Sequence, residues 1–142
     1  MFIKLTNGVP EIYTIGQLRR DNPNTSFPKD IPHETLASWD VYPLTVLKKP
    51  KYNTLTQTIK QDTPQNVNGA WVVSWVVENL PEEQAASNTR EYRNSLLIEC
   101  DWTQVIDATV DQTAWASYRQ QLRDISAQPT FPYLVSWPIK PE

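Results

Sequence analysis

The side chains of this sequence that could carry out chemistry are carboxylates, one cysteine and one histidine. A glycosidase needs two carboxylates on either side of a cleft, about 5–9.5 Å apart. The carboxylates of the second half have only the spacing of ordinary helix decoration: Glu82, Glu83, Glu91, Glu99, Asp101 and Asp107. His33 has no cysteine or carboxylate pattern around it, so it is a poor metal ligand or base. We therefore expect no enzyme, no metal site and no cofactor.

Nonpolar contact is the chemistry that the sequence does favour. The last 43 residues contain half of the six tryptophans, and the candidate docking residues in them are Trp102, Trp115, Tyr118, Phe131 and Trp137. Large rigid rings held by a short helix and by prolines suit a packing or docking surface. We predict a protein-binding role for these rings, and for Trp71 and Trp75 on an expected strand. For each ring, packing in the core of the chain itself is the alternative.

Two arginines, Arg119 and Arg123, belong to the same candidate protein-binding set. They lie four residues apart in an expected helix, and Asp124 follows directly. Exposed ion pairs contribute little free energy. The spacing therefore leaves two alternatives open: the guanidinium groups are solvated or paired locally, or they form a clamp for a partner.

Composition limits the class of partner. The chain of 142 residues has a formal net charge of -3 and an isoelectric point near 5.2. Nucleic acid is disfavoured because phosphate binding needs a basic face. The one basic run, Lys48, Lys49 and Lys51, is typical of a solvated loop. We expect neither a signal peptide nor a membrane span, and the single Cys100 fits a reducing compartment.

Proline and glycine divide the chain into two parts. All three glycines and eight of the twelve prolines lie at or before residue 81, and neither type occurs from residue 82 to residue 128. These residues mark turns and interrupt helices. We predict an α+β protein with a small antiparallel β module over residues 1–79, followed by a helical C-terminal module over residues 80–142 that ends in an extended proline-rich tail.

Alternating apolar residues predict two hairpins in the first module. Residues 2–6 and 9–13 flank the pair Asn7-Gly8, which favours a tight turn. Thr14 is expected to cap a short helical turn through Arg20, and residues 32–39 could form another. Residues 54–60 and 70–77 would form the second hairpin, with residues 62–69 as its turn. The strand over 70–77 is apolar on both faces, so we expect both to be covered, one of them by another subunit.

The second module is expected to contain two helices. Pro81-Glu82-Glu83 favours the start of a helix that continues to about Glu99. Its apolar stripe is thin and consists of Ala85, Thr89, Tyr92 and Leu96. Such a helix either packs along a partner, including a second copy, or connects other parts in solvent.

The last helix is predicted from a second apolar face. Trp115, Tyr118 and Leu122 recur at steps of three and four residues. Thr109 to Gln112 matches a capping box at its start. The prolines after Ser126 end the helix and could fold Phe131 and Trp137 back over this face.

An ordered set of motifs extends from residue 93 to residue 138. It consists of Arg93-Asn94-Ser95-Leu96-Leu97, Cys100-Asp101-Trp102-Thr103-Gln104, Asp107, Trp115 with Tyr118-Arg119 and Leu122-Arg123-Asp124-Ile125, Phe131-Pro132 and Trp137-Pro138. This order resembles the C-terminal pattern of the bacteriophage tail assembly chaperone family, whose members often accompany tail fibre genes. The chain departs from the pattern at Ala108-Thr109-Val110, where many relatives have Pro and Leu, and at Thr130, where Gly is usual.

The resemblance implies a phage protein that helps a tail fibre protein to fold, trimerise or attach. The implied partner is the phage tail fibre protein, and the chain itself would be a homo-oligomer, most simply a trimer that matches the fibre. The implied location is the host cytoplasm during assembly. As the alternative, the chain would be a permanent virion component at the fibre, either a cap or a tip that binds a receptor or carbohydrate.

Overall fold

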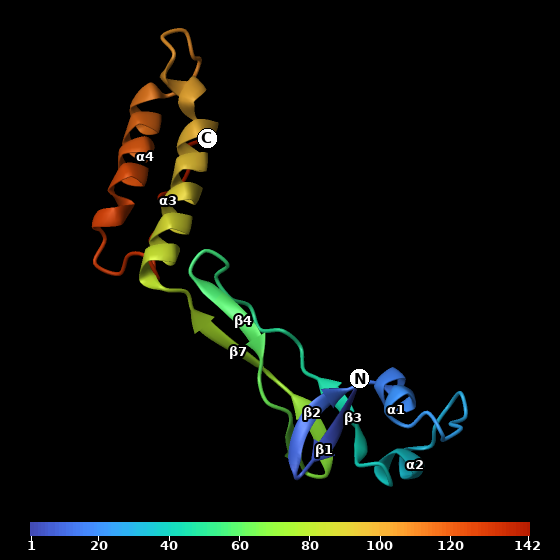
Figure 1. The fold of residues 1–142 in the computed structure, drawn as a ribbon. Coiled ribbons are helices and arrows are strands. Elements are labelled where there is room, and N and C mark those ends of the chain that lie inside the picture. The colour runs from blue at the N-terminus through green and yellow to red at the C-terminus, as the bar shows by residue number, and fades with distance from the viewer. The chain divides into compact units, whose positions relative to one another are not determined.

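The computed structural model describes residues 1–142 and divides the chain into two compact units (Figure 1). Unit 1 comprises residues 1–51 and 59–77, and unit 2 comprises residues 52–58 and 78–142. Strands lie mainly in unit 1 and helices mainly in unit 2, so the protein is of the α+β class. The short segment Tyr52–Thr58 belongs to unit 2 although it precedes most of that unit in the sequence. The boundary between two modules that we predicted after residue 79 stays a prediction.

The first hairpin forms as predicted. Strand β1 (Phe2–Thr6) pairs antiparallel with β2 (Val9–Tyr13), and Ile3 lies opposite Ile12. Asn7 and Gly8 connect the strands with φ angles of 53° and 81°, the left-handed conformation that this tight turn requires. Helix α1 (Ile15–Asp21) follows directly, because the Thr14 side chain accepts a hydrogen bond from the Gln17 backbone N–H. The short helix α2 (His33–Ala37) lies within the range predicted for it.

The main sheet is mixed, so the prediction of a wholly antiparallel module is wrong. Its strand order is β2-β1-β3-β6-β5, where β3 is Val41–Val46, β5 is Gln65–Val67 and β6 is Ala70–Val73. Strand β3 is antiparallel to β1 but parallel to β6, with Leu44 opposite Trp71. The chain leaves this sheet after Val46 and re-enters it at the edge strand β5, and β6 then pairs with β3 in the same direction. This long-range return leaves no local mark in the sequence.

The predicted strand over residues 70–77 consists of two strands in different sheets. Ser74 separates β6 from β7 (Trp75–Asn79), and its carbonyl accepts a hydrogen bond from the Asp62 N–H. Strand β7 pairs with β4 (Gln57–Gln61), so the two predicted segments meet over part of their length, but β5 and β6 lie between them in the chain and the predicted simple hairpin is wrong. The expected turn over residues 62–69 itself contains strand β5. The tight turn is Asn68-Gly69, with φ angles of 52° and 85°.

Unit 1 has two small apolar cores. Ile3, Leu44 and Val73 form one, with Trp71 packed against it. The other is closed by residues from the loops and from both short helices: Tyr13, Leu18, Leu36 and Val41, with Phe2, Ile15, Phe27, Ile31 and Trp39 packed around them.

Unit 2 is built on a helical hairpin. Helix α3 (Glu82–Glu99) has the predicted bounds, the 3-10 turn η1 (Asp101–Gln104) follows it, and α4 (Gln112–Asp124) runs back beside α3 (Figure 1). The stripe expected on α3 is covered in part within the unit: Ala85 and Thr89 are buried and Leu96 packs against the core of the hairpin, but Tyr92 is 43% exposed. The predicted capping box at Thr109 is wrong. Asp111 caps α4 instead, and its carboxylate accepts hydrogen bonds from the N–H groups of Thr113 and Ala114.

The last part of unit 2 has no helix or strand after the 3-10 turn η2 (Ile125–Ala127). Residues 129–133 form turns, residue 134 is a bend, and residues 135–142 have no regular structure. Gln128 holds this segment by two hydrogen bonds with Ser136: its amide donates to the Ser136 carbonyl at 2.9 Å and accepts from the Ser136 N–H at 2.8 Å. The Tyr133 hydroxyl donates to the Leu80 carbonyl at 2.8 Å. These contacts attach the segment to the start of the helical hairpin.

Candidate functional site

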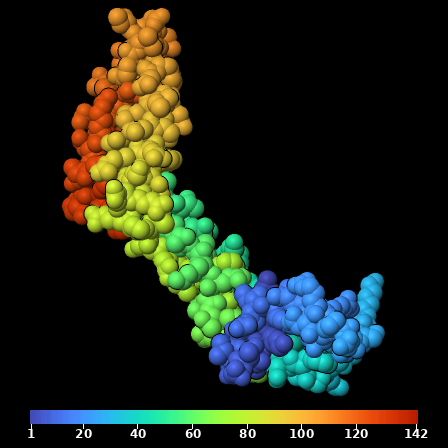
Figure 2. Space-filling view, viewed as in Figure 1, coloured from blue at the N-terminus to red at the C-terminus, as the bar shows by residue number.

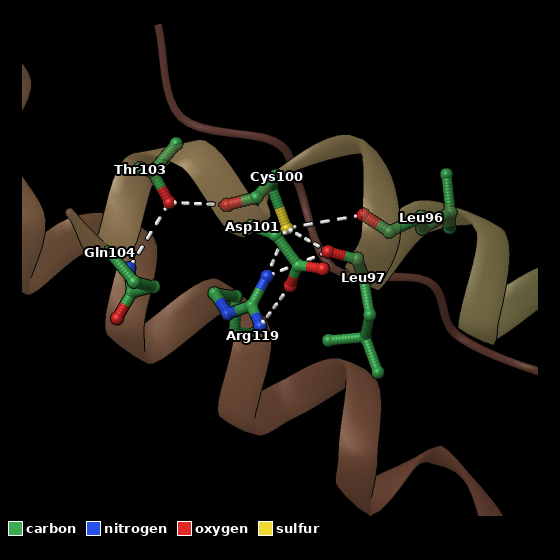
Figure 3. Close-up of polar contacts among 7 residues, drawn as sticks. All are labelled: Leu96, Leu97, Cys100, Asp101, Thr103, Gln104 and Arg119. Atoms are coloured by element: carbon green, nitrogen blue, oxygen red, sulfur yellow. Dashed lines mark hydrogen bonds and ion pairs between the residues drawn. The ribbon is translucent and has the colours of Figure 1, made fainter. Parts of the chain in front are cut away.

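Arg119 joins the two helices of the hairpin (Figure 3). Its Nη1 donates to the Leu97 carbonyl at 2.7 Å and to Cys100 Sγ at 3.0 Å, and its Nη2 donates to Asp101 Oδ1 at 2.7 Å. The side chain is 9% exposed, so these partners must satisfy a buried charge. The Cys100 thiol in turn contacts the Leu96 carbonyl at 3.1 Å. Of the alternatives that the sequence left open for Arg119, pairing within the chain describes the structure, and the carboxylate partner is Asp101 on η1.

Two pKa values in this part of the hairpin are raised. For Arg119, burial disfavours the charged guanidinium, but the hydrogen bonds and charges of Asp101 and Cys100 outweigh burial and raise its pKa. For Tyr118, burial is the main cause, and neighbouring negative groups including Glu99 add to it, so its pKa is raised. Both groups therefore keep their protonated forms over a wider pH range than in water.

Trp115 and Tyr118 form the core of the hairpin. They are 3% and 6% exposed and pack with Leu122 and Cys100. The two rings meet edge to face, with centroids 5.7 Å apart. Of the two alternatives for these rings, core packing describes the unbound chain, and a contact with a partner would first require them to be uncovered.

Trp102 differs from its neighbour Trp115 in exposure. Its ring centroid lies 6.2 Å from that of Trp115, yet the side chain is 54% exposed. Three further apolar side chains around the turn from α3 to α4 are also exposed: Ile98 at 71%, Val105 at 52% and Ile106 at 99%. We call the four residues Ile98, Trp102, Val105 and Ile106 the hairpin end. Figure 2 shows this end, in orange, with no other segment of unit 2 over it on the side in view.

Several hydrogen bonds fix the chain at the hairpin end. The Thr103 hydroxyl donates to the Cys100 carbonyl at 2.6 Å and stabilises the 3-10 turn that carries Trp102. The Gln112 side chain donates to the Val105 carbonyl at 2.7 Å, and Asp111 caps α4. A turn held in this way can offer apolar side chains to a partner at a small cost in ordering entropy.

The sequence prediction included Trp102 but missed Ile98, Val105 and Ile106. Ile98 occupies a helical position that the pattern assigned to no face. Val105 and Ile106 lie between two helices. Two adjacent apolar residues followed by Asp107 in such a connection could have indicated an exposed apolar site. Apolar residues in a connection that lacks its own core to cover them are candidates for a docking surface.

The predicted residues of the tail occupy a different part of unit 2. Trp137 packs against the core of the hairpin and meets Tyr92 edge to face at 5.0 Å, so this ring folds back as expected. Phe131 is half-buried, with the guanidinium of Arg90 5.1 Å from its ring centroid. Arg123 is exposed on α4. Beside Trp137 lies an open hollow of about 620 Å³, lined by Gln121, Asp124, Gln128, Ser136, Trp137, Pro138 and Ile139.

The two candidate tryptophans of unit 1 are partly buried. Trp71 packs against the core of the sheet. The Trp75 indole N–H donates to the Leu47 carbonyl at 2.7 Å, and the Lys49 ammonium lies 4.6 Å from the centroid of its ring.

No group of three or more His, Cys, Asp and Glu side chains has the arrangement of a metal site. None of the helices combines the length and the apolar character that a membrane crossing needs.

Comparison with known proteins gives one match. Residues 86–142 match the family model described as phage tail assembly chaperone protein. The matched segment contains most of α3, all of α4, the hairpin end and the tail, and it confirms the resemblance seen in the motifs over residues 93–138. No similar curated protein and no similar solved structure was found.

Proposed function

We propose that this chain is a phage tail assembly chaperone that binds a tail fibre protein while the fibre folds and trimerises. The observation that carries the proposal is the hairpin end, four exposed apolar side chains on a hydrogen-bonded turn inside the segment that matches the family. Cys100 and Thr103 within this segment are buried, but the four side chains of the hairpin end are mostly exposed and belong to no core cluster of the chain. These four side chains are therefore available to a partner.

A tail fibre that is still assembling needs a partner that covers its exposed apolar surface. Intertwined β fibres assemble slowly, and their unpaired strand edges and apolar faces are exposed until the trimer closes. A rigid apolar surface that covers these regions lowers the population of aggregating species. Trp102 suits this contact because a large ring buries much area and loses little conformational entropy. The place of action would be the host cytoplasm during assembly.

Co-expression tests this proposal. The fibre protein of the same phage is produced with the wild-type chain, without it, and with the Trp102→Ala/Ile106→Asp variant. Soluble trimeric fibre is then measured by native gel and size-exclusion chromatography. We expect a high yield only with the wild-type chain. An equal yield in all three cultures would contradict the proposal.

A second candidate function rests on the hollow beside Trp137. Amide, carboxylate and hydroxyl groups together with a tryptophan and a proline suit a neutral sugar, whose faces are apolar and whose edges donate and accept hydrogen bonds. In this case the chain stays on the virion as a cap or a carbohydrate-binding tip. Mass spectrometry of purified virions, together with a glycan array, separates the two functions. A chaperone that leaves is absent from the virion and binds no glycan, whereas a tip is present at a copy number like that of the fibre.

A further inference from the structure

The hairpin end carries negative charge around its apolar side chains. Residues 94–118 contain four carboxylates and no lysine, arginine or histidine. Asp101 is paired with Arg119, and Asp111 caps α4. Glu99 and Asp107 are exposed and take part in no ion pair within the chain. Lys140 is a basic group nearby, 5.8 Å from the centroid of the Trp115 ring. A partner that covers the hairpin end should therefore combine apolar side chains with lysines or arginines.

Unit 1 contains a segment with this chemistry. After β3, residues 47–53 have no helix or strand. Val46 and Leu47 are exposed large apolar side chains, and Lys48 and Lys51 are exposed as well. We call these four residues the basic segment. Its backbone is held in place, since the Leu47 N–H donates to the Val73 carbonyl at 3.0 Å and the Leu47 carbonyl accepts from Trp75.

We propose that the hairpin end of one copy binds the basic segment of a second copy. Val46 and Leu47 would pack on Trp102 and Ile106, while Lys48 and Lys51 would pair with Glu99 and Asp107. Each of the two segments combines exposed apolar side chains with charged ones, and the two sets of charges have opposite sign, which favours the pairing of these two segments. Because the two surfaces differ, the contact is heterologous, and each copy can take part in two such contacts.

This proposal goes beyond the proposed function. The fibre protein and the second copy would compete for the hairpin end. Self-association would then keep the apolar side chains covered until a client is made. Because self-association is measured without any fibre protein, its failure leaves the chaperone function untouched.

Charge reversal tests the contact with the full chain alone. Sedimentation velocity is recorded at tens of micromolar and at low salt for the wild type, for Glu99→Lys/Asp107→Lys and for Lys48→Glu/Lys51→Glu. We expect the wild type to self-associate and each variant to have a dissociation constant raised about tenfold or more, the size of effect seen for close charge pairs at interfaces. High salt should weaken the wild-type association in the same direction.

Mixing the two variants gives the sharpest result. One then supplies a basic hairpin end and the other an acidic segment, so the mixture should associate although neither variant does so alone. Asp30→Lys/Glu142→Lys, a matched reversal of two exposed carboxylates elsewhere, should associate like the wild type. Circular dichroism checks folding, and the neutral Lys48→Gln/Lys51→Gln replaces any charge variant that does not fold. A monomeric wild type, unaffected charge variants or a mixture that stays dissociated would each overturn the proposal.

Discussion

Unit 1 and unit 2 distribute their exposed apolar side chains in different ways. Apart from the adjacent pair Val46 and Leu47 of the basic segment, the exposed apolar residues of unit 1 are spread over several strands, among them Val9 and Ile12 on β2 and Val67 on β5. Single exposed apolar residues of this kind are normal on a protein surface. In unit 2 four of them fall within residues 98–106, around one turn. A cluster in a short rigid segment indicates a docking surface more strongly than the aromatic content of either unit does.

Within unit 2, Trp115 and Trp102 show the difference between a core residue and an exposed one. They are in contact, yet one fills the core and the other faces solvent. The first should therefore determine the stability of unit 2 and the second its interactions.

The largest effect is expected from Trp115→Ala. Removal of a ring that is almost fully buried leaves a cavity and should lower the free energy of unfolding by about 3–5 kcal/mol. Trp102→Ala is the matched control, and it should cost less than about 1 kcal/mol because its ring is half-exposed. Urea unfolding followed by circular dichroism measures both. Equal losses would remove the distinction between the two rings.

The second-largest loss of stability is expected from Arg119→Leu. The change leaves the Leu97 carbonyl and the Cys100 thiol without their buried partner, which should cost about 2–4 kcal/mol. Asp101→Asn should cost less than about 1 kcal/mol, because the Asp101 side chain is 62% exposed and water can replace its partner. The same unfolding curves compare the two variants. A larger loss for Asp101→Asn would show that the ion pair, rather than the buried hydrogen bonds, holds the helices.

A smaller effect distinguishes the observed cap of α4 from the one predicted by the sequence. Asp111→Ala removes the acceptor for two backbone N–H groups and should lower stability by about 1 kcal/mol. Thr109→Ala, at the position of the rejected capping box, should have almost no effect. Thermal melting of the two variants decides between these positions.

The smallest effect on stability at neutral pH is expected from Tyr13→Phe in unit 1. Burial, with the hydrogen bond to Asp21, raises the pKa of Tyr13 to about 12 from its ordinary value of 10.0. A raised pKa means that the folded form holds its proton more tightly, so this stability is complete below pH 10 and is lost as the pH rises towards 12. Tyr13→Phe should flatten the loss over this window. Urea unfolding from pH 9 to pH 12 tests the sign, and stability that rose with pH would contradict it.

Local signals in the sequence were sufficient for much of the fold. Asn7-Gly8 fixed the first hairpin, Thr14 the start of α1, and the Pro81-Glu82-Glu83 run the start of α3. Each depends on backbone preferences of neighbouring residues. The parallel pairing of β3 with β6 and the break at Ser74 depend on which distant strands meet, and no residue of either strand encodes that choice locally.

The same limit applies to the candidate site. The sequence identified Trp102 and the family motifs around it, but it could not separate exposed from buried rings. Trp115 and Trp102 have the same chemistry, and only the packing of α4 against α3 distinguishes them. Ile106, the most exposed apolar residue of the hairpin end, was missed because apolar residues are assigned to a core by default.

The central claim is that the hairpin end is the surface that binds the tail fibre protein. Isothermal titration of the purified chain against the fibre protein of the same phage tests it directly, with Ile106→Asp as the test variant and Val9→Asp, an exposed apolar residue of unit 1, as the control. We expect Ile106→Asp to weaken binding by about 2 kcal/mol or more, as for an interface hot spot, and Val9→Asp to leave the affinity unchanged. Equal affinities for the wild type and Ile106→Asp would show that the hairpin end is not the surface that binds the fibre protein.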